Sequence, residues 1–556
     1  MRSICLYFQV HQPYRLRTYR FFNIGDEHNY YDEYQNRQII RRVAEKCYLP
    51  ANKMMLDLIK EYGKAFKVTF SISGTAIEQL QQYTPEVIQG FRQLAKTGCV
   101  EFLAETYAHS LASLGNREEF VKQVELHSSK IEELFGQRPK TFRNTELIYS
   151  DDVGEMVSDM GFTTMITEGA KHILGWKSPN YMYCSARNPK LRLLLRNFRL
   201  SDDIAFRFST LEWAEWPLTA EKFTGWLNNI EIREEVVNVF IDYETIGERQ
   251  WKETGIFEFF RALPKTVLSK SNFRFATPSD LADALQTVAQ IHVPYPISWA
   301  DEERDLTSWL GNELQDEAFS KLYSLQSRIK DIKDPEIQRD WQNLQTSDHF
   351  YYMCTKWFSD GTVHKYFNPY PSPYEAFINY MNVLSDFMIR VDDAVAREIS
   401  ALGGAKEARE KETGKAVKTV KKRPRTTIGK LVEKETIIRP AKIRAAKQKV
   451  EKIAKAETKT PAGKDAEEPF HSLNVDDIIH LSDNKVKKLI KALEIETLSA
   501  AMKGAKKEVR EKLEKNLGKR ALKTYQELLK EIKTIHESEI KKSRRLFEKQ
   551  IKVLLK

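Results

Sequence analysis

The sequence predicts an α/β fold: a βα barrel, followed by helical and charge-rich segments. Short β-rich apolar runs alternate with helical patterns from residue 1 to about residue 290, and after residue 297 long helical patterns replace this alternation. Strands that alternate with helices indicate a parallel sheet. About seven such units over this length favour a closed or nearly closed barrel over an open sheet, although periodicity alone does not decide closure.

The individual elements follow from local patterns. Strands are predicted where β-branched and aromatic residues gather, at 4–10, 66–72, 100–103, 141–145, 162–167, 191–198, 237–241 and 273–276. Helices are predicted where apolar residues recur at helical spacing, at 38–61, 86–97, 118–134 and 220–230.

Polar and ionisable residues recur directly after consecutive predicted strands. In chain order they are His11 and Gln12, Ser73, Glu105 and His109, Glu146, Glu168, Asp202 and Asp203, and Asp242 and Glu244. The carboxyl ends of the strands of a βα barrel share one face, and that face carries the active site. The recurrence therefore predicts an active site assembled from several strand ends.

Glu146 and Asp242 are the candidate pair of catalytic carboxylates. Glu146 follows the strand at 141–145 and precedes Ser150, which can cap a helix running to about residue 160. A carboxylate at a strand-to-helix junction lies where α/β folds place their chemistry. Asp242 directly follows the strand at 237–241.

The chain is predicted to contain four parts. A catalytic barrel spans 1–290, and a helical domain at 291–400 carries an aromatic block around Asp348 and His349. Residues 401–470 are rich in Ala, Lys and Glu, contain four prolines, and are predicted to form a solvated linker. Residues 471–556 show apolar stripes at helical spacing and are predicted to form a small helical domain.

The basic charge belongs to the linker. It contains 20 Lys/Arg and 10 Asp/Glu, so it carries the whole net charge of +10. Its basic runs leave contact with nucleic acid or an anionic surface open as an alternative. No aromatic residue lies between 401 and 469, so base stacking is unsupported and nucleic-acid binding is not expected.

Composition excludes several classes of protein. The five cysteines are far apart and form no CxxC pair, which argues against a zinc knuckle and a disulfide framework. No run of 18 apolar residues occurs, so no membrane span is expected. The N-terminus shows no recognisable signal peptide. A cytoplasmic protein without cofactor or metal is the expectation.

Five segments, in order, resemble the motifs of glycoside hydrolase family 57, most closely its α-amylase branch. They are FQVHQPYRL (8–16), EFLAETYAH (101–109), RNTELIY (143–149), DYETIGE (242–248) and TSDHFYY (346–352). The resemblance covers about residues 1–390. It implies a seven-stranded βα barrel, a helical domain that completes the site, and retaining chemistry on α-glucans or maltooligosaccharides.

The resemblance also implies roles for residues. Glu146 would be the nucleophile and Asp242 the general acid/base. Substrate-binding residues would be His11, Gln12, His109, Glu244, Arg249, Trp251, Asp348, His349 and Tyr351. Retaining hydrolysis needs two carboxyl groups about 5–5.5 Å apart, one ionised and one protonated. In extended geometry Asp242 and Glu244 would share a face, so Glu244 is expected to orient or perturb Asp242. The sequence departs from the branch at Arg249, where the branch usually has histidine.

The C-terminal part resembles a different family. Residues 498–513 and 516–521 are similar to the C-terminal helical domain of the flagellar motor-switch protein FliG, and the resemblance covers about 75 residues. Because nothing else in the chain suggests a flagellum, residues 471–556 are interpreted as a module for a protein partner or for self-association.

The sequence leaves more than one function open. The first is hydrolysis of α-1,4-glucans, and a 4-α-glucanotransferase, which passes the sugar to another glucan, is its close alternative. The second is a glucan-binding or scaffold protein whose barrel has lost turnover. The presence of both carboxylates favours the enzyme, and Arg249 and the appended helical module keep the non-catalytic alternative open.

Overall fold

The computed structural model describes residues 2–356, 368–414, 486, 502, 505–517, 522 and 525 of the 556-residue chain. The chain divides into two compact units, Met1–Lys421 and Lys422–Lys556. All strands of the described residues lie in the first unit. In the second unit the described helix is α22 (Lys507–Asn516), which buries Val509 and Leu513 at helical spacing.

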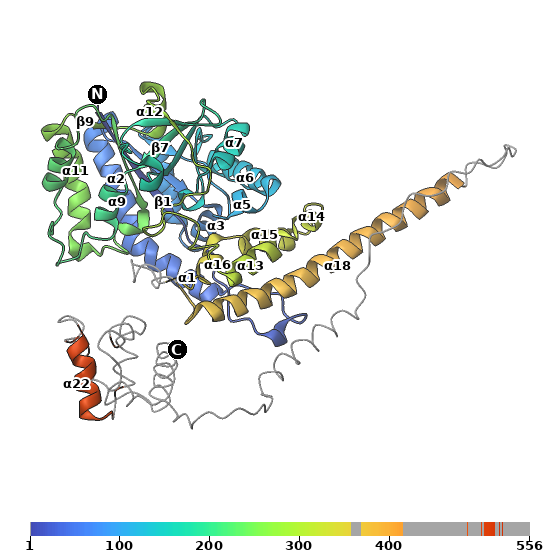
Figure 1. The fold of residues 1–556 in the computed structure, drawn as a ribbon. Coiled ribbons are helices and arrows are strands. Elements are labelled where there is room, and N and C mark those ends of the chain that lie inside the picture. The colour runs from blue at the N-terminus through green and yellow to red at the C-terminus, as the bar shows by residue number, and fades with distance from the viewer. Residues whose placement is uncertain are drawn as a thin grey trace. The chain divides into compact units, whose positions relative to one another are not determined.

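Seven parallel strands form the central barrel of the first unit (Figure 1). They are β1 (Arg2–Val10), β2 (Val68–Ile72), β3 (Val100–Phe102), β4 (Thr141–Arg143), β5 (Thr164–Glu168), β7 (Arg192–Arg196) and β8 (Val236–Asp242). In one sheet β3, β2, β1 and β8 are neighbours, and in the other β7, β5 and β4 are neighbours.

The ends of these two sheets meet, which closes the barrel. A parallel bridge between Ala104 and Phe142 joins the end of β3 to β4. On the other side the amide of Asn197 donates to the carbonyl of Asn238 at 2.8 Å, and the Asn238 side-chain amide donates to the carbonyl of Leu195 at 2.8 Å. Strands β7 and β8 are therefore held together by hydrogen bonds although they form no regular ladder.

Strand β1 shows how the sequence separates the two faces of the barrel. Successive side chains of a strand point to opposite faces. Cys5 and Tyr7 pack inside the barrel against residues of β7 and β8, whereas Leu6 and Phe8 pack outward against the surrounding helices. Gln9, the next inward position, is polar and lines a cavity at the carboxyl end of the barrel.

Helices surround the barrel (Figure 1). They are α1 (Glu33–Val43), α2 (Leu49–Tyr62), α3 (Gly74–Tyr83), α4 (Pro85–Lys96), α5 (Ala112–Gly115), α6 (Arg117–Phe135), α7 (Asp151–Asp159), α8 (Lys171–Leu174), α9 (Phe198–Ala205), α10 (Ala220–Asn228), α11 (Ile256–Lys270) and α12 (Pro278–Ala284). The predicted helix at 38–61 is two helices, α1 and α2, joined by a π-helical turn at Ala44–Tyr48.

A helical region follows the barrel. It contains α13 (Glu313–Tyr323), α14 (Gln326–Ile329), α15 (Pro335–Leu344), α16 (Ser347–Tyr351) and α18 (Pro373–Gly414). Helix α18 packs on α13, α14 and α15, and their apolar residues share one core with the barrel residues around α7. Helix α18 continues to Gly414, beyond the expected domain boundary at residue 400. The rest of the expected linker, 415–470, lies outside the described residues.

Three short strands lie beside the seven. Strand β6 (Met182–Ser185) pairs antiparallel with β7, β10 (Gln290–Ile291) extends β6, and β9 (Phe273–Phe275) pairs with the start of β1. Of these only β9 was predicted. The other two, β6 with four residues and β10 with two, were not predicted.

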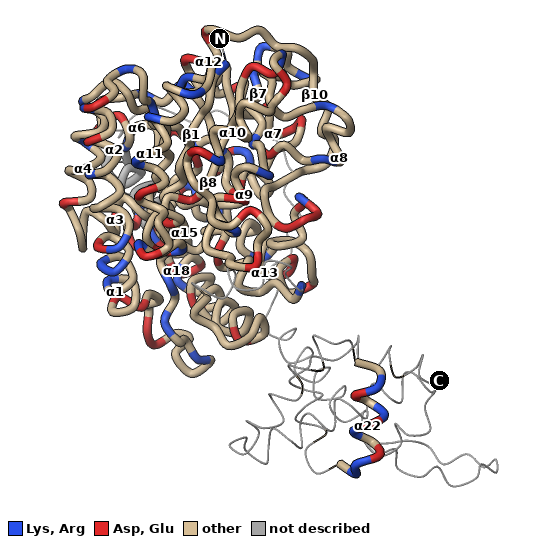
Figure 2. The backbone as a smooth tube through the Cα atoms, turned by 90° about the vertical axis from the view of Figure 1, so that its left-hand side faces the viewer, with Lys and Arg blue, Asp and Glu red and all other residues tan. Residues whose placement is uncertain are grey.

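Charges on the first unit are mixed. Figure 2 shows basic and acidic positions interspersed over this part of the chain. Among the described residues, no helix is long and apolar enough to span a membrane.

The first unit should fold without the second. A chain ending at Lys421 keeps every large apolar cluster found in the barrel and the helical region. We expect a cooperative thermal transition within about 4 °C of that of the full chain, measured by circular dichroism. A truncated chain that melts without a cooperative transition would contradict this division.

Candidate active site

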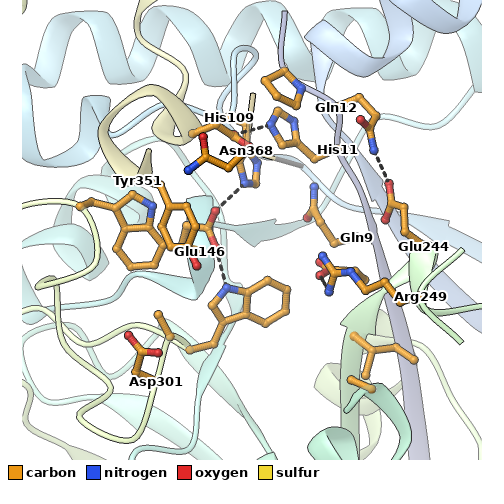
Figure 3. Close-up of a pocket in the computed structure, with 18 of the residues that line it drawn as sticks. Gln9, His11, Gln12, His109, Glu146, Glu244, Arg249, Asp301, Tyr351 and Asn368 are labelled. Atoms are coloured by element: carbon orange, nitrogen blue, oxygen red, sulfur yellow. Dashed lines mark hydrogen bonds and ion pairs between the residues drawn. The ribbon is translucent and has the colours of Figure 1, made fainter. Parts of the chain in front are cut away.

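A cavity opens at the carboxyl ends of the barrel strands and is also lined by residues of α16, and Figure 3 shows side chains that line it. Its lining includes Glu146, Asp242, His11, Gln12, His109, Glu244, Arg249, Asp348 and Tyr351 from the residues predicted above. These residues lie at or after the ends of four strands, β1, β3, β4 and β8, or belong to α16, and they meet in one place. This assembly is what the recurrence of polar residues after the strands predicts.

Glu146 lies in a tight turn between β4 and α7. The turn, Thr145–Leu147, is a single 3₁₀ turn in which Glu146 has φ 56°, an uncommon conformation for a residue with a side chain. The Ser150 hydroxyl accepts a hydrogen bond from the amide of Val153 and caps α7, as predicted. Strand and helix thus hold the turn from both sides and direct the carboxylate into the cavity.

Three donors approach the Glu146 carboxylate. The indole Nε1 of Trp299 donates to Oε2 at 2.6 Å, and Nε2 of His109 lies 3.2 Å from Oε1. The hydroxyl of Ser347, at the start of α16, lies 3.5 Å from Oε1. Because both oxygens are engaged, the carboxylate is held in a defined orientation.

The environment of Glu146 favours its ionised form. Burial acts to raise the pKa of the carboxyl, but the hydrogen bond and charge of His109, the charge of Arg143 and the Trp299 donor outweigh it, so the pKa is lowered. Arg143 is itself buried, 5.3 Å from the centre of the Trp299 ring. Glu146 therefore has the charge state that a nucleophile requires.

His11 links the barrel to the helical region. Its Nδ1 lies 2.7 Å from the hydroxyl of Ser73, and its Nε2 lies 2.9 Å from Asp348 on α16. The His11 ring stacks on that of His109 with centroids 3.9 Å apart. Burial and the neighbouring charge of His109 lower the pKa of His11. Burial opposes ionisation of Asp348, but His11 and His109 lower its pKa to about 2.

Arg249 forms an ion pair with Asp242. Its Nη1 lies 2.5 Å from Oδ2 of Asp242, and both side chains are about one-fifth exposed. A carboxylate in such a pair is favoured in its ionised form. Arg249 therefore engages a carboxylate oxygen of the predicted acid/base directly.

Glu244 is the neighbouring carboxyl and is buried. It accepts hydrogen bonds from the Tyr48 hydroxyl and, at 3.4 Å, from Gln12 Nε2 (Figure 3). Burial and then the charge of Asp242 raise the pKa of Glu244 to about 7. The expected extended geometry is wrong, because the backbone turns at Tyr243–Thr245. Glu244 nevertheless reaches the same cavity and perturbs the charge balance around Asp242.

A tight loop carries Arg249. The amide of Arg249 donates to the carbonyl of Glu244 at 2.9 Å. Gly247 has φ +102°, and a Cβ atom there would lie 2.2 Å from the carbonyl oxygen of Lys46. Glycine is therefore required at this position for Arg249 to turn back towards Asp242.

Comparison with known proteins identifies the family. The model of glycosyl hydrolase family 57 matches residues 5–294, slightly more than half of the chain. The chain belongs to glycosyl hydrolase family 57. A protein of Methanocaldococcus jannaschii named "Putative alpha-amylase" is 43% identical over 406 residues, which cover 70% of this chain and 85% of that protein.

Solved structures of family 57 share the fold. Branching enzymes from Thermococcus kodakaraensis and Pyrococcus horikoshii align with TM-scores of 0.53, at 12% and 15% identity. Each alignment covers 72% of this chain and 91% of the other. They confirm the barrel and the helical content of the first unit.

A second family model, the FliG C-terminal domain, matches residues 471–556, as the resemblance predicted.

Two predicted substrate-binding residues lie outside the lining of this family 57 cavity. Trp251 is 58% exposed, because its neighbour Gln250 turns inward and donates to the carbonyl of Ala205 at 2.9 Å. His349 is buried in α16 and bonds the carbonyl of Asn343 at 3.2 Å. Adjacent helical residues diverge by about 100°, so His349 faces away when Asp348 faces the cavity.

Sequence reasoning missed several lining residues. They include Gln9, Arg15, Trp299, Asp301, Arg304, Trp309, Tyr352 and Asn368. Trp299 and its neighbours belong to a loop after the barrel, where no periodic pattern marks their direction. Tyr352 lies inside the fifth motif and could have been named from it. Within the part of the chain that is described, no group of His, Cys, Asp and Glu is arranged to hold a metal ion.

Proposed function

We propose that this family 57 member is a retaining glycoside hydrolase that acts on α-1,4-glucans, with Glu146 as nucleophile and Asp242 as general acid/base. The observation that carries the proposal is the ionised, doubly anchored Glu146 in a cavity that also contains Asp242. The substrate class is supported by the name of the relative that shares 43% identity. The stacking surfaces of Trp299 and Tyr351 suit sugar rings.

The proposed reaction has two displacements. A Glu146 oxygen attacks the anomeric carbon, the glycosidic bond breaks, and the leaving oxygen takes a proton from Asp242. The oxygen of an incoming water then attacks the same carbon while its proton passes to Asp242 and the bonding electron pair returns to Glu146. A sugar hydroxyl in place of water gives transfer to a second glucan, the 4-α-glucanotransferase alternative.

The proton for the first displacement is shared between two carboxyl groups. Asp242 and Glu244 line the same cavity, and the charge of Asp242 helps to raise the pKa of Glu244. Arg249 forms an ion pair with Asp242. Substrate that displaces Arg249 from Asp242 would let the proton move to the residue that acts as the acid. If Arg249 is not displaced, the non-catalytic glucan-binding alternative is favoured.

We propose that residues 471–556 form a docking module for a protein partner or a second copy, on the basis of the FliG C-terminal match. The residues of the cavity all lie before residue 370. A cytoplasmic location, an expectation of the sequence, is part of the same proposal. Light scattering on the full chain and on the chain ending at Lys421 tests the module. We expect the two proteins to differ in self-association or in partner binding. The same association state and the same partner binding in both would argue against the module.

Loss of each catalytic carboxylate should leave a different residual chemistry. Glu146→Ala removes the nucleophile, and azide added externally should restore turnover of an activated aryl α-glucoside with inverted product. Asp242→Ala keeps the nucleophile, so the same substrate should still glycosylate it, and azide should give retained product. Each substitution should cost about 4 kcal/mol, or about a thousandfold, in kcat/KM towards maltooligosaccharides.

Product anomers determined by NMR distinguish the two variants. Tyr34→Phe changes an exposed aromatic residue that does not line the cavity, so it serves as the control for the effects of substitution and purification on activity. Near wild-type activity of Glu146→Ala would remove Glu146 from the role of nucleophile.

Arg249→His should change the pH profile. The guanidinium is a permanent charge that pairs with Asp242 and favours ionisation of Glu244. Without it Glu244 should keep its proton to higher pH, so the basic limb of kcat/KM should move upward. The ratio of transfer to hydrolysis should change as well. An identical profile and product pattern in the two proteins would show that Arg249 has no part in the reaction.

A further inference from the structure

Glu105 is a buried carboxylate that the mechanism above does not use. It lies just after β3, and its side chain is fully shielded from solvent. Its Oε2 lies 2.9 Å from Nδ1 of His109 and 3.6 Å from Nη1 of Arg143. Gln9 Nε2 lies 3.2 Å from Oε1. Burying a carboxylate in this way is costly unless cations and donors surround it.

The position of His109 between two carboxylates defines its protonation. Nδ1 faces Glu105 at 2.9 Å and Nε2 faces Glu146 at 3.2 Å. A neutral imidazole has one N–H donor and one lone pair, and the lone pair would then face an anionic oxygen. Only the doubly protonated ring donates to both neighbours. His109 also has φ 52°, which shows that the backbone is held in an uncommon conformation where the ring bridges the two groups.

We propose that Glu105 is a positioning residue that keeps His109 doubly protonated, so that His109 donates to Glu146 throughout the reaction. The proposal rests on the proposed function, because it gives His109 a task at the nucleophile. In the second displacement, the electron pair of the breaking bond returns to Glu146, and the Nε2–H of His109 stabilises the carboxylate that leaves. Glu105 acts through His109 and has no contact with substrate in this account.

The surrounding charges act on His109 in both directions. Arg143 lies 3.6 Å from Glu105 and 3.4 Å from Nδ1 of His109, so it stabilises the Glu105 carboxylate but opposes the charge on His109. The ring of His11 stacks on His109. Asp348 lies on the other side of His11. His127 reaches the backbone of Glu105, with its Nδ1 accepting from the Glu105 amide at 3.3 Å.

The pKa directions follow from the same contacts. Burial and Arg143 oppose the charge on His109, but Glu105 and Glu146 raise its pKa to about 9. Burial opposes the charge on Glu105, but His109 and Arg143 lower its pKa to about 2. A cation with a raised pKa stays protonated below that value and is lost as pH rises through it. His109 is therefore charged at neutral pH, and that charge disappears near pH 9.

The charge state of His109 can be observed directly. Side-chain ¹⁵N NMR of the full-length protein with labelled histidine reports protonation of each ring nitrogen, with His109→Gln used for assignment. We expect both nitrogens of His109 to be protonated at pH 7 in the wild-type protein. A neutral His109 at pH 7 would overturn the proposal whether or not the protein hydrolyses glucans.

Glu105→Gln tests the cause. The amide keeps the shape but removes the charge, so His109 should lose its proton at lower pH. The limb of kcat/KM that reports loss of the His109 proton, which is distinct from the limb set by Glu244, should move downward. Each pH unit of that movement costs about tenfold in kcat/KM above the limb. A purely structural role would lower the whole profile, without moving the limb or the His109 titration.

Glu101→Gln is the matched control. Glu101 lies on β3 four residues earlier and accepts hydrogen bonds from Thr141 and Ser279, with no contact to His109. In Glu101→Gln we expect the titration of His109 and the pH dependence of kcat/KM to equal those of the wild-type protein. If Glu105→Gln does not fold, Glu105→Asp keeps the charge but shortens the reach, and an intermediate His109 titration is expected. An unchanged His109 titration in folded Glu105→Gln, or in Glu105→Asp, would refute the role of Glu105.

Discussion

The active site of this enzyme depends on keeping a carboxylate charged after it has been removed from water. An isolated buried carboxylate would bind a proton, because burial disfavours the charged form. Around Glu146 that tendency is overcome by the Trp299 indole and by His109, with Arg143 behind them. The side chains come from β4, from the segment after β3 and from a loop beyond the barrel. The barrel therefore supplies the positive charges of His109 and Arg143 near Glu146. The loop supplies the Trp299 N–H, which donates a hydrogen bond to the carboxylate in place of water.

On the opposite side of the cavity, the proposed mechanism requires a carboxyl group that is protonated. A general acid must hold a proton before it acts, and Arg249 pairs directly with Asp242, the proposed acid/base. The nearby Glu244, buried against Tyr48, has the raised pKa. In the proposed mechanism the site separates a stable anion on one side from a protonated carboxyl group on the other, and displacement of Arg249 lets the proton reach Asp242.

Much of the barrel could be predicted from sequence, since buried strands and amphipathic helices leave strong periodic patterns. Strand β8 and helices α4 and α6 lie within a few residues of their predicted bounds. Glu146 and Asp242 could be singled out because each follows such a strand. Trp299 could not, because it lies in a loop whose direction depends on tertiary contacts: its backbone amide donates to the carbonyl of Glu146 at 3.2 Å. Trp251 was misplaced for the same reason, since the loop after β8 turns Gln250 inward.

Trapping the glycosyl-enzyme tests the central claim most directly. The protein would be mixed with an activated fluorinated α-glucosyl donor that glycosylates quickly and hydrolyses slowly, quenched in acid, digested and mapped by mass spectrometry. The account predicts a single sugar adduct on the peptide that contains Glu146, absent from Glu146→Ala, and an α-anomer as the first product. An adduct on Asp242 or on another carboxylate, or an inverted product without any adduct, would contradict it.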